Sequence, residues 1–220
     1  MLLKNPDLEP MQTLADLQRR LGGVPLERVR FVPFPGTATE ANVVAARNGP
    51  ERRLCELVAG VLVEKPMGFY ESRLAAVLIR LLDQYAVTHD VGIVVGADGM
   101  MRLSPGLVRI PDVSFVSWER LPNRKLPRAA VPDLAPDLAV EIISGGNTPE
   151  EMENKLQEYF AAGVRMVWYV YPKECTARAY TGPDSCTEIS EGDALDGGDV
   201  LPGFRVALRD WLALAGEVED

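Results

Sequence analysis

The sequence predicts an α/β (α+β) fold with a mixed β-sheet core flanked by helices. Residues 138–143 (LAVEII) and 166–171 (MVWYVY) are almost continuously apolar, which is typical of strands covered on both faces. Residues 148–162 between them have helical periodicity. This strand–helix–strand unit indicates two parallel strands joined by a right-handed crossover.

The first part of the chain carries weaker signals. Residues 11–21 are predicted to form a short amphipathic helix, and the Pro- and Gly-rich residues 22–50 an irregular connection. We therefore expect an N-terminal helix and irregular extension over residues 1–50, followed by one domain over residues 51–220.

Further elements are predicted in chain order within that domain. The runs LCELV and VLVEK flank Ala59-Gly60 and indicate a β-hairpin. The other predicted elements are a helix over residues 69–87, strands over residues 93–95, 108–116 and 177–181, and a strand and helix after Gly203.

The helix over residues 148–162 has the clearest predicted start. Thr148 suits the N-cap, Pro149 suits the first helical position, and Glu151 would complete a capping box. Gly163 stands where a C-terminal cap belongs. The start of the helix fixes which of its residues face the sheet.

Composition excludes several classes of protein. The 220 residues are 47% hydrophobic and 25% charged, as expected for a globular chain with a real core. The apolar runs are far shorter than a membrane span, and the N-terminus has no apolar signal core, so we expect a cytoplasmic protein without a membrane partner. Three separated cysteines and one histidine argue against a disulfide framework or an ordinary zinc site.

The net charge of −9 is unusual for a protein that binds nucleic acid nonspecifically. The charge is uneven, however, because residues 118–128 carry four bases and one acid, whereas residues 182–198 carry five acids and no base. Both runs are compatible with solvated loops. Alternatively, the basic run faces phosphate while the total charge stays acidic.

Two acids occupy positions where apolar residues are expected. Glu141 lies in the middle of LAVEII, where an ionised carboxylate is costly unless it is paired or binds a metal. Asp112 lies in RIPDVSFV and, by alternation, shares a face with Ile110 and Ser114. The alternative for both is a satisfied ion pair or a wet sheet edge.

Lys155 is the third candidate. It lies at the border of the buried stripe of the helix, from which its stem could bring the ammonium to the rim of the sheet. The alternative is a surface pair with Glu151. Two nearby carboxylates favour a hard divalent ion between them, and a lysine beside that ion could orient a nucleophile.

Three segments in order, RIPDVSFV, PDLAVEIIS and NTPEEMENKLQEYFAAGVRMVWYV, resemble the Uma-type family of bacterial proteins classed as endonucleases. That family belongs to the PD-(D/E)XK superfamily, whose fold is that of restriction endonucleases. The resemblance runs from about Cys55 to Leu212 and includes the closing LPGFRVALRDWL.

The resemblance implies roles for individual residues. Asp112 and Glu141 would be metal ligands, with the carbonyl of Ile142 as a third. The usual superfamily lysine is replaced by Ile143, and the lysine of this family, on the following helix, matches Lys155.

A further acid is implied from the first helix of the fold. Glu71 is the candidate and Glu56 in the hairpin is the alternative, although the histidine that commonly lies near Glu71 in the family is absent here.

The function implied is Mg²⁺- or Mn²⁺-dependent hydrolysis of phosphodiester bonds in DNA. Lys155 would position the attacking water, and a two-fold homodimer would suit double-strand cleavage. The alternatives are a non-catalytic descendant of the fold that binds nucleic acid or protein, and a structural role for the acids as ion pairs.

Overall fold

The structure is a computed structural model that describes residues 12–66 and 68–216. Residues 1–11 of the predicted extension and residues 217–220 of the predicted domain lie outside this range. The helices are α1 (Leu14–Arg20), α2 (Glu40–Asn48), α3 (Phe69–His89), α4 (Pro149–Ala161) and α5 (Leu208–Ala215), with 3-10 turns η1 (Leu26–Arg28), η2 (Trp118–Arg120) and η3 (Pro122–Arg124).

The strands form two sheets and a small ribbon. The four-stranded sheet has the order β2-β1-β5-β4, with β1 (Cys55–Val58), β2 (Val61–Glu64), β4 (Met101–Ser104) and β5 (Leu107–Arg109). The six-stranded sheet has the order β10-β9-β8-β7-β6-β3, with β3 (Gly92–Val95), β6 (Val113–Ser117), β7 (Leu138–Ile142), β8 (Met166–Tyr171), β9 (Thr176–Gly182) and β10 (Ser185–Ile189). The ribbon pairs β11 (Ala194–Asp196) with β12 (Arg205–Ala207).

The predicted mixed sheet and its crossover are confirmed. Strands β7 and β8 are parallel and joined through α4, whereas the other neighbours in the six-stranded sheet are antiparallel. All five residues of β7 are buried, as expected for a central strand covered on both faces.

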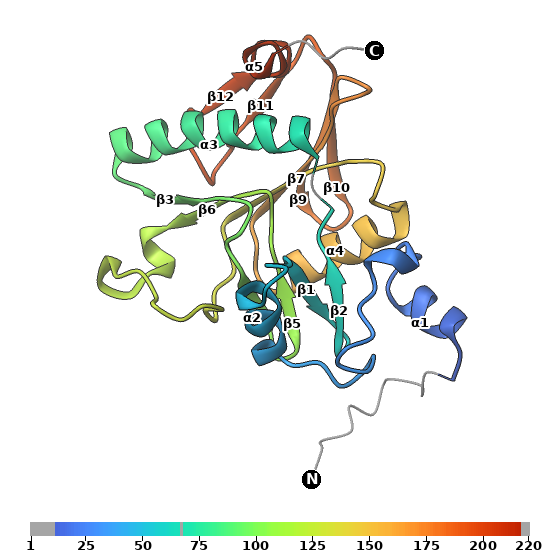
Figure 1. Cartoon of the computed structure of the whole chain (residues 1–220). Coiled ribbons are helices and arrows are strands. Elements are labelled where there is room, and N and C mark those ends of the chain that lie inside the picture. Colours follow the sequence, from blue (N-terminus) through green and yellow to red (C-terminus); the bar gives the residue numbers. More distant parts are fainter. Residues whose placement is uncertain (1–11, 67, 217–220) are drawn as a thin grey trace.

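Helices cover both faces of the six-stranded sheet (Figure 1). Helices α3 and α5 pack on the face that carries Val140 and Trp168. Helix α4 packs on the opposite face, where Leu156 and Tyr159 meet Ala139 and Val167. Glu141 has the same parity in β7 as Ala139, so its side chain points toward α4.

The predicted single strand over residues 108–116 is wrong. The chain forms β5 in the small sheet and β6 in the large one, and Asp112 lies between them rather than on a strand face. Pro111 has no N–H to donate to a ladder, and the Asp112 N–H donates to the carbonyl of Val140 at 3.0 Å. The chain therefore crosses from one sheet to the other at Asp112.

The N-terminal segment packs on the β1–β2 hairpin. Leu17 and Leu21 contact Val61 and Val63 on one face of the hairpin. On the other face, Val43 of α2 packs in a cluster with Cys55 and Leu57. Helix α2 lies within the stretch predicted to be irregular, and its capping box, formed by Thr39 and Asn42, was not recognised in the sequence.

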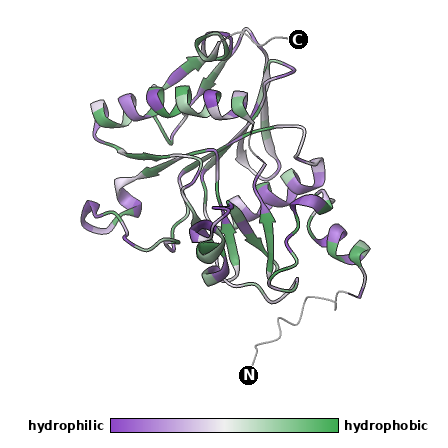
Figure 2. Cartoon of the chain, in the orientation of Figure 1, coloured by the Kyte–Doolittle hydropathy of each residue, from purple (hydrophilic) through white to green (hydrophobic). Residues whose placement is uncertain are grey.

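The hydropathy of the chain follows this packing (Figure 2). The hairpin strands are largely hydrophobic, whereas the loop after β6 is strongly hydrophilic. Within the part of the chain that the structure describes, no helix has the length and apolar character needed to cross a bilayer.

Candidate metal and catalytic site

Glu141 lies at the centre of a buried polar cluster. Its Oε1 accepts a hydrogen bond from the Tyr159 hydroxyl at 2.6 Å and lies 3.2 Å from Lys155 Nζ. Both partners come from α4, which covers this face of β7. The sequence-predicted acid and lysine are therefore in direct contact.

Lys155 reaches Glu141 because of how α4 begins. Thr148 caps the helix by accepting the Glu151 N–H at 3.2 Å, and Lys155 follows two turns later on nearly the same face. The predicted rim position for its ammonium is wrong, because the Lys155 side chain is 1% exposed. The Nζ bridges Glu141 and Glu56 at 3.2 Å each.

Glu151 has a different role from either prediction. Its carboxylate forms a two-point ion pair with Arg28, at 2.8 Å for each oxygen, instead of closing a capping box or pairing with Lys155. Arg28 also donates to the carbonyls of Glu64 and Gly146. The N-terminal extension thus fixes the start of α4 against the hairpin.

Glu56 joins the cluster from the small sheet. The pairing of Leu57 with Val108 sets Glu56 opposite Arg109, and Glu56 Oε2 lies 2.7 Å from the Arg109 guanidinium. Glu56 Oε1 also accepts the Ile110 N–H at 3.1 Å. Arg109 in turn pairs with Glu158 of α4 at 2.5 Å. Both sheets and α4 therefore meet at this set of charges.

Asp112 is held beside Glu141 by the backbone of β7. Its N–H donates to the Val140 carbonyl, and its Oδ2 accepts the Ile142 N–H at 2.7 Å. Asp112 is thus hydrogen-bonded to Val140 and Ile142, the residues immediately before and after Glu141. Its Oδ1 lies 2.8 Å from the ammonium of Lys65, a residue that the sequence analysis did not single out.

The acids differ in their protonation preference. Burial opposes the charge on Glu56, but Lys155, Arg109 and Lys65 outweigh burial and hold the pKa of Glu56 at about 2. Burial raises the pKa of Glu141, and the nearby charges of Asp112 and Glu56 add to the rise. The difference arises because Glu56 has a guanidinium and a backbone N–H of its own in addition to Lys155.

The lysine and tyrosine that contact Glu141 are both held in their protonated forms. Burial disfavours the charge on Lys155, but Glu141 and Glu56 outweigh burial and raise its pKa. Burial and Glu141 raise the pKa of Tyr159, which keeps its hydroxyl a hydrogen-bond donor. The ionised form of Glu141 therefore depends on these two donors.

The donor set suits a hard cation bound by few protein ligands. Within residues 12–66 and 68–216, no group of three or more His, Cys, Asp or Glu side chains is arranged to hold a metal. Asp112 and Glu141 can offer two carboxylates at one end of β7, with water or substrate oxygen completing the shell. Mg²⁺ is usually bound in this way, through one or two carboxylates.

The other predicted ligands have different positions. Glu71 is in the first turn of α3, and its carboxylate folds back over Gly68 at the helix N-terminus. Its contacts in the described part of the chain do not join it to Asp112 or Glu141. Ile142 is buried at the end of β7, and its N–H is bonded to Asp112.

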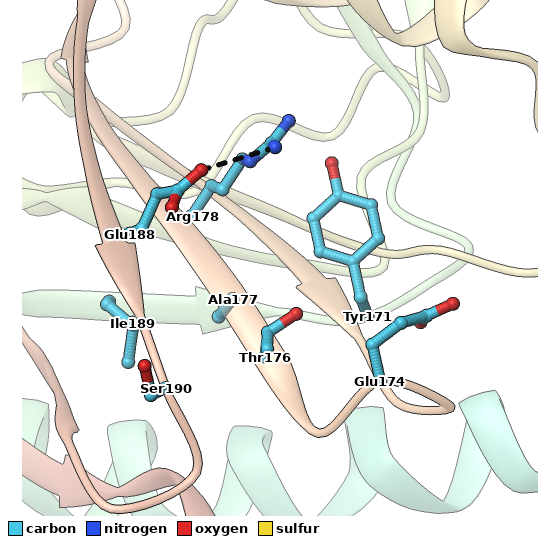
Figure 3. Close-up of a pocket in the computed structure, with 8 residues that line it drawn as sticks. All are labelled: Tyr171, Glu174, Thr176, Ala177, Arg178, Glu188, Ile189 and Ser190. Carbon is cyan, nitrogen blue, oxygen red and sulfur yellow. Dashed lines mark hydrogen bonds and ion pairs between the residues drawn. The ribbon is translucent and has the colours of Figure 1, made fainter.

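One surface cavity, of about 450 Å³, reaches the cluster at Arg109 and Glu158, whereas two others lie away from it. Figure 3 shows one of about 300 Å³ at the edge formed by β8, β9 and β10, where Arg178 pairs with Glu188 at 3.4 Å and stacks over Tyr171. Neither Asp112, Glu141 nor Lys155 lines it. Its charges are paired with each other, so it offers no comparable set of catalytic groups.

Another cavity, of about 670 Å³, lies beside the basic run. Arg124 stacks over the Trp118 ring at 5.3 Å and pairs with Asp90, whereas Arg120 pairs with Asp137. Residues 122–130 are all exposed. The basic run therefore forms solvent-facing surface.

A mixed sheet with a parallel strand–helix–strand unit, and acids near one end of its central strand, is the arrangement expected of a restriction-endonuclease-like fold. Comparison with known families agrees. The profile of the Uma2 family, described as "Putative restriction endonuclease", matches residues 46–212. The chain belongs to the Uma2 family, and the resemblance noted in its motifs is confirmed.

A solved structure supports the fold. It is the crystal structure of "a putative nuclease belonging to DUF820" from Anabaena variabilis, with a TM-score of 0.66 and 17% sequence identity. The match covers 74% of this chain and 92% of that one. No curated protein sequence matches the chain.

Sequence reasoning missed Lys65 and Arg109. A signal for Lys65 was present, since it extends the alternation of the β2 strand on the face that carries Val61 and Val63. A lysine that continues an apolar face is anomalous in the same way as Glu141. Arg109 gave no such signal, because its partner Glu56 lies more than fifty residues earlier in the chain.

Proposed function

We propose that this protein is a divalent-metal-dependent endonuclease that hydrolyses phosphodiester bonds of DNA. The observation that carries the proposal is the position of Asp112, which accepts the N–H of Ile142, the neighbour of Glu141 at the end of β7, with Lys155 hydrogen-bonded to Glu141. Membership of the Uma2 family supports the same class of reaction.

Each residue has a distinct part in this proposal. Asp112 and Glu141 would hold Mg²⁺ or Mn²⁺, with the Ile142 carbonyl as the proposed third protein ligand. When bound, such an ion lowers the pKa of water and stabilises charge on a phosphoryl group. Lys155 holds Glu141 in place and opposes the rise that burial causes in its pKa, and we assign Lys155 the orientation of the attacking water. Tyr159 supports Glu141 through its 2.6 Å hydrogen bond.

The basic run after β6 is the proposed contact for the DNA backbone. It begins six residues after Asp112, which at about 3.3 Å per residue places it about 20 Å away along the strand. That distance is comparable to the width of a DNA duplex. We therefore assign this run to phosphates about one duplex width from the scissile group, rather than to those next to the cleaved bond. Cleavage of both strands would call for a two-fold dimer.

One observation favours the alternative of a non-catalytic, structural cluster. Glu56, Asp112 and Glu141 each already have a cationic partner within 3.2 Å. In that case the charges would only join the hairpin, β7 and α4, and the fold would bind nucleic acid or protein without cleaving it.

Cleavage assays on the intact chain separate the two functions. Supercoiled plasmid and labelled oligonucleotides are incubated with Mg²⁺, with Mn²⁺ and with EDTA, using the wild type, Asp112→Asn and the exposed control Asp184→Asn. We expect cleavage that needs the divalent ion and is lost in Asp112→Asn alone. Divalent-independent binding of DNA without cleavage in any of the conditions would establish the non-catalytic alternative.

A further inference from the structure

Lys65 lies at the junction of the two sheets. It follows β2 directly, and its N–H donates to the Leu54 carbonyl at 2.9 Å, so the hairpin pairing continues through it. Because side chains alternate along a strand, Lys65 shares a face with Val63 and with Glu56, the residue opposite Val63. That face is turned toward α4 and the acids of the site.

The ammonium of Lys65 contacts two oxygen atoms of the segment that carries Asp112. It lies 2.8 Å from Asp112 Oδ1 and donates to the carbonyl of Ile110. The other oxygen of Asp112 accepts the Ile142 N–H. Lys65 therefore neutralises Asp112, one of the two carboxylates proposed as metal ligands.

Both lysines of the site are buried, with side chains 3% exposed for Lys65 and 1% for Lys155, but the acids they contact differ in their access to solvent. Lys155 lies between Glu56 and Glu141, and the side chains of all three residues are at most 4% exposed. The Asp112 side chain is 13% exposed, the most open of the three acids. A cation that enters from solvent therefore meets the Asp112–Lys65 pair before it meets the Glu141–Lys155 pair.

We propose that Lys65 is the resident cation of the metal site: it neutralises Asp112 in the metal-free protein, leaves Asp112 when a divalent ion binds, and then contacts the substrate phosphate. This inference rests on the proposed function, because it takes Asp112 to be a metal ligand. It adds a second lysine, with a different role, to the one predicted from the sequence.

Charge balance supports the exchange. A divalent ion that replaces the ammonium at Asp112 adds two positive charges to the site, because the displaced ammonium remains nearby. The phosphodiester group brings negative charge to the same place. The four-carbon stem of lysine allows its ammonium to move while the stem stays packed, and lysine binds phosphate well as a point charge.

Lysine labelling of the wild-type protein tests the exchange directly. The protein is acetylated with limiting acetic anhydride, with and without Mn²⁺, and each lysine is quantified by mass spectrometry. Lys65 should be protected without Mn²⁺ and acetylated about fivefold faster with it, since release from Asp112 opens a buried contact. The exposed Lys125 and Lys173 serve as internal controls whose labelling should stay constant.

Metal affinity provides a second readout that does not depend on cleavage. Mn²⁺ binding is measured by calorimetry for the wild type, Lys65→Met, Lys65→Arg and the control Lys173→Met. Removing the competing charge should tighten Mn²⁺ binding to Lys65→Met by about tenfold or more. Lys65→Arg keeps the charge and should stay near the wild type. Lys65→Met should nevertheless cleave DNA more slowly, because it lacks the phosphate contact.

The outcomes separate this inference from the proposed function. Unchanged labelling of Lys65, together with wild-type Mn²⁺ affinity in Lys65→Met, would overturn the role of Lys65 while loss of binding in Asp112→Asn still supported the metal site. Failure of the wild type to bind Mn²⁺ would overturn both. If Lys65→Met does not fold, the labelling of the wild-type protein decides the question.

Discussion

The ammonium of Lys155 lies 3.2 Å from a carboxylate oxygen of Glu141, with both side chains almost completely shielded from water. A second carboxylate, that of Glu56, lies at the same distance from the ammonium. One lysine on α4 therefore joins the central strand of the large sheet to the first strand of the small one. Removing one partner from such a buried set leaves uncompensated charge, which makes the roles of the individual residues measurable.

Glu141→Gln should abolish divalent-dependent cleavage without unfolding the chain. The substitution keeps the shape and removes the charge, and burial already raises the pKa of Glu141, so a neutral side chain is tolerated there. Lys155 retains Glu56 as a partner. We expect the cleavage rate to fall by about 100-fold or more, as with other losses of transition-state charge stabilisation.

The matched control for Glu141→Gln is Glu150→Gln, which changes an exposed acid on α4. Cleavage rate and thermal unfolding are measured for both. A large fall in melting temperature with cleavage retained would show that Glu141 is structural.

Lys155→Met should lower both stability and cleavage rate. It leaves Glu56 and Glu141 close together without the cation between them, which should cost about 3–5 kcal/mol of unfolding free energy. Urea denaturation measures the stability, and single-turnover kinetics at saturating metal measures the rate. A surface pair with Glu151 would have predicted almost no effect on either quantity.

A double-mutant cycle checks that the loss in Lys155→Met comes from these contacts. The loss of unfolding free energy caused by Lys155→Met should be smaller in a Glu141→Gln background, because one of the two carboxylates left without a cation is then neutral. Additive costs would mean that Lys155 stabilises the fold through packing rather than through its charge.

The stability of the protein should fall in acid through Glu56. Its pKa is held at about 2, below the ordinary value of 4.5, so its contribution is present above pH 4.5 and is lost as the pH falls toward 2. The contribution of Glu141 to stability changes with pH in the opposite direction, because its raised pKa favours the protonated form in the folded protein. Urea unfolding at pH 5 and pH 3 should show a steeper loss for the wild type than for Glu56→Gln. Equal losses would contradict the pairing of Glu56 with its cations.

The basic run after β6 should contribute to DNA affinity. Lys125→Ala and Arg128→Ala remove charges from exposed positions, so each should weaken binding of all DNA sequences and reduce the slope of log affinity against log salt by about one. Fluorescence anisotropy at several salt concentrations measures both effects, with Lys173→Ala as the control. A salt slope that does not change in either variant would exclude this run from the DNA contact.

Local patterns were sufficient to predict the central part of the fold. The apolar runs around Glu141 and Trp168 identified β7 and β8, and the cap at Thr148 fixed the face of α4 that carries Lys155. These signals depend on residues close together in the chain. They could not show how deeply Lys155 is buried, because its second partner, Glu56, comes from another sheet.

The part of the site that sequence reasoning missed depends on contacts between distant segments. Lys65 and Asp112 are almost fifty residues apart, and the pair forms only when the hairpin packs against the chain between β5 and β6. The same crossing was hidden in RIPDVSFV, where alternation predicted one strand. Pro111 indicated a break in the strand. Only the hydrogen bond from the Asp112 N–H to the Val140 carbonyl shows that the chain then joins the large sheet beside β7.

The most direct test of the account is anomalous diffraction from a crystal of the protein soaked in Mn²⁺. The account predicts one strong Mn²⁺ peak between the carboxylates of Asp112 and Glu141, with Mn²⁺–oxygen distances of about 2.0–2.3 Å. It also predicts that the peak is absent from an Asp112→Asn crystal treated in the same way. A well-ordered soaked crystal in which Mn²⁺ is absent from these carboxylates, with Lys65 still bonded to Asp112, would contradict the proposed metal site.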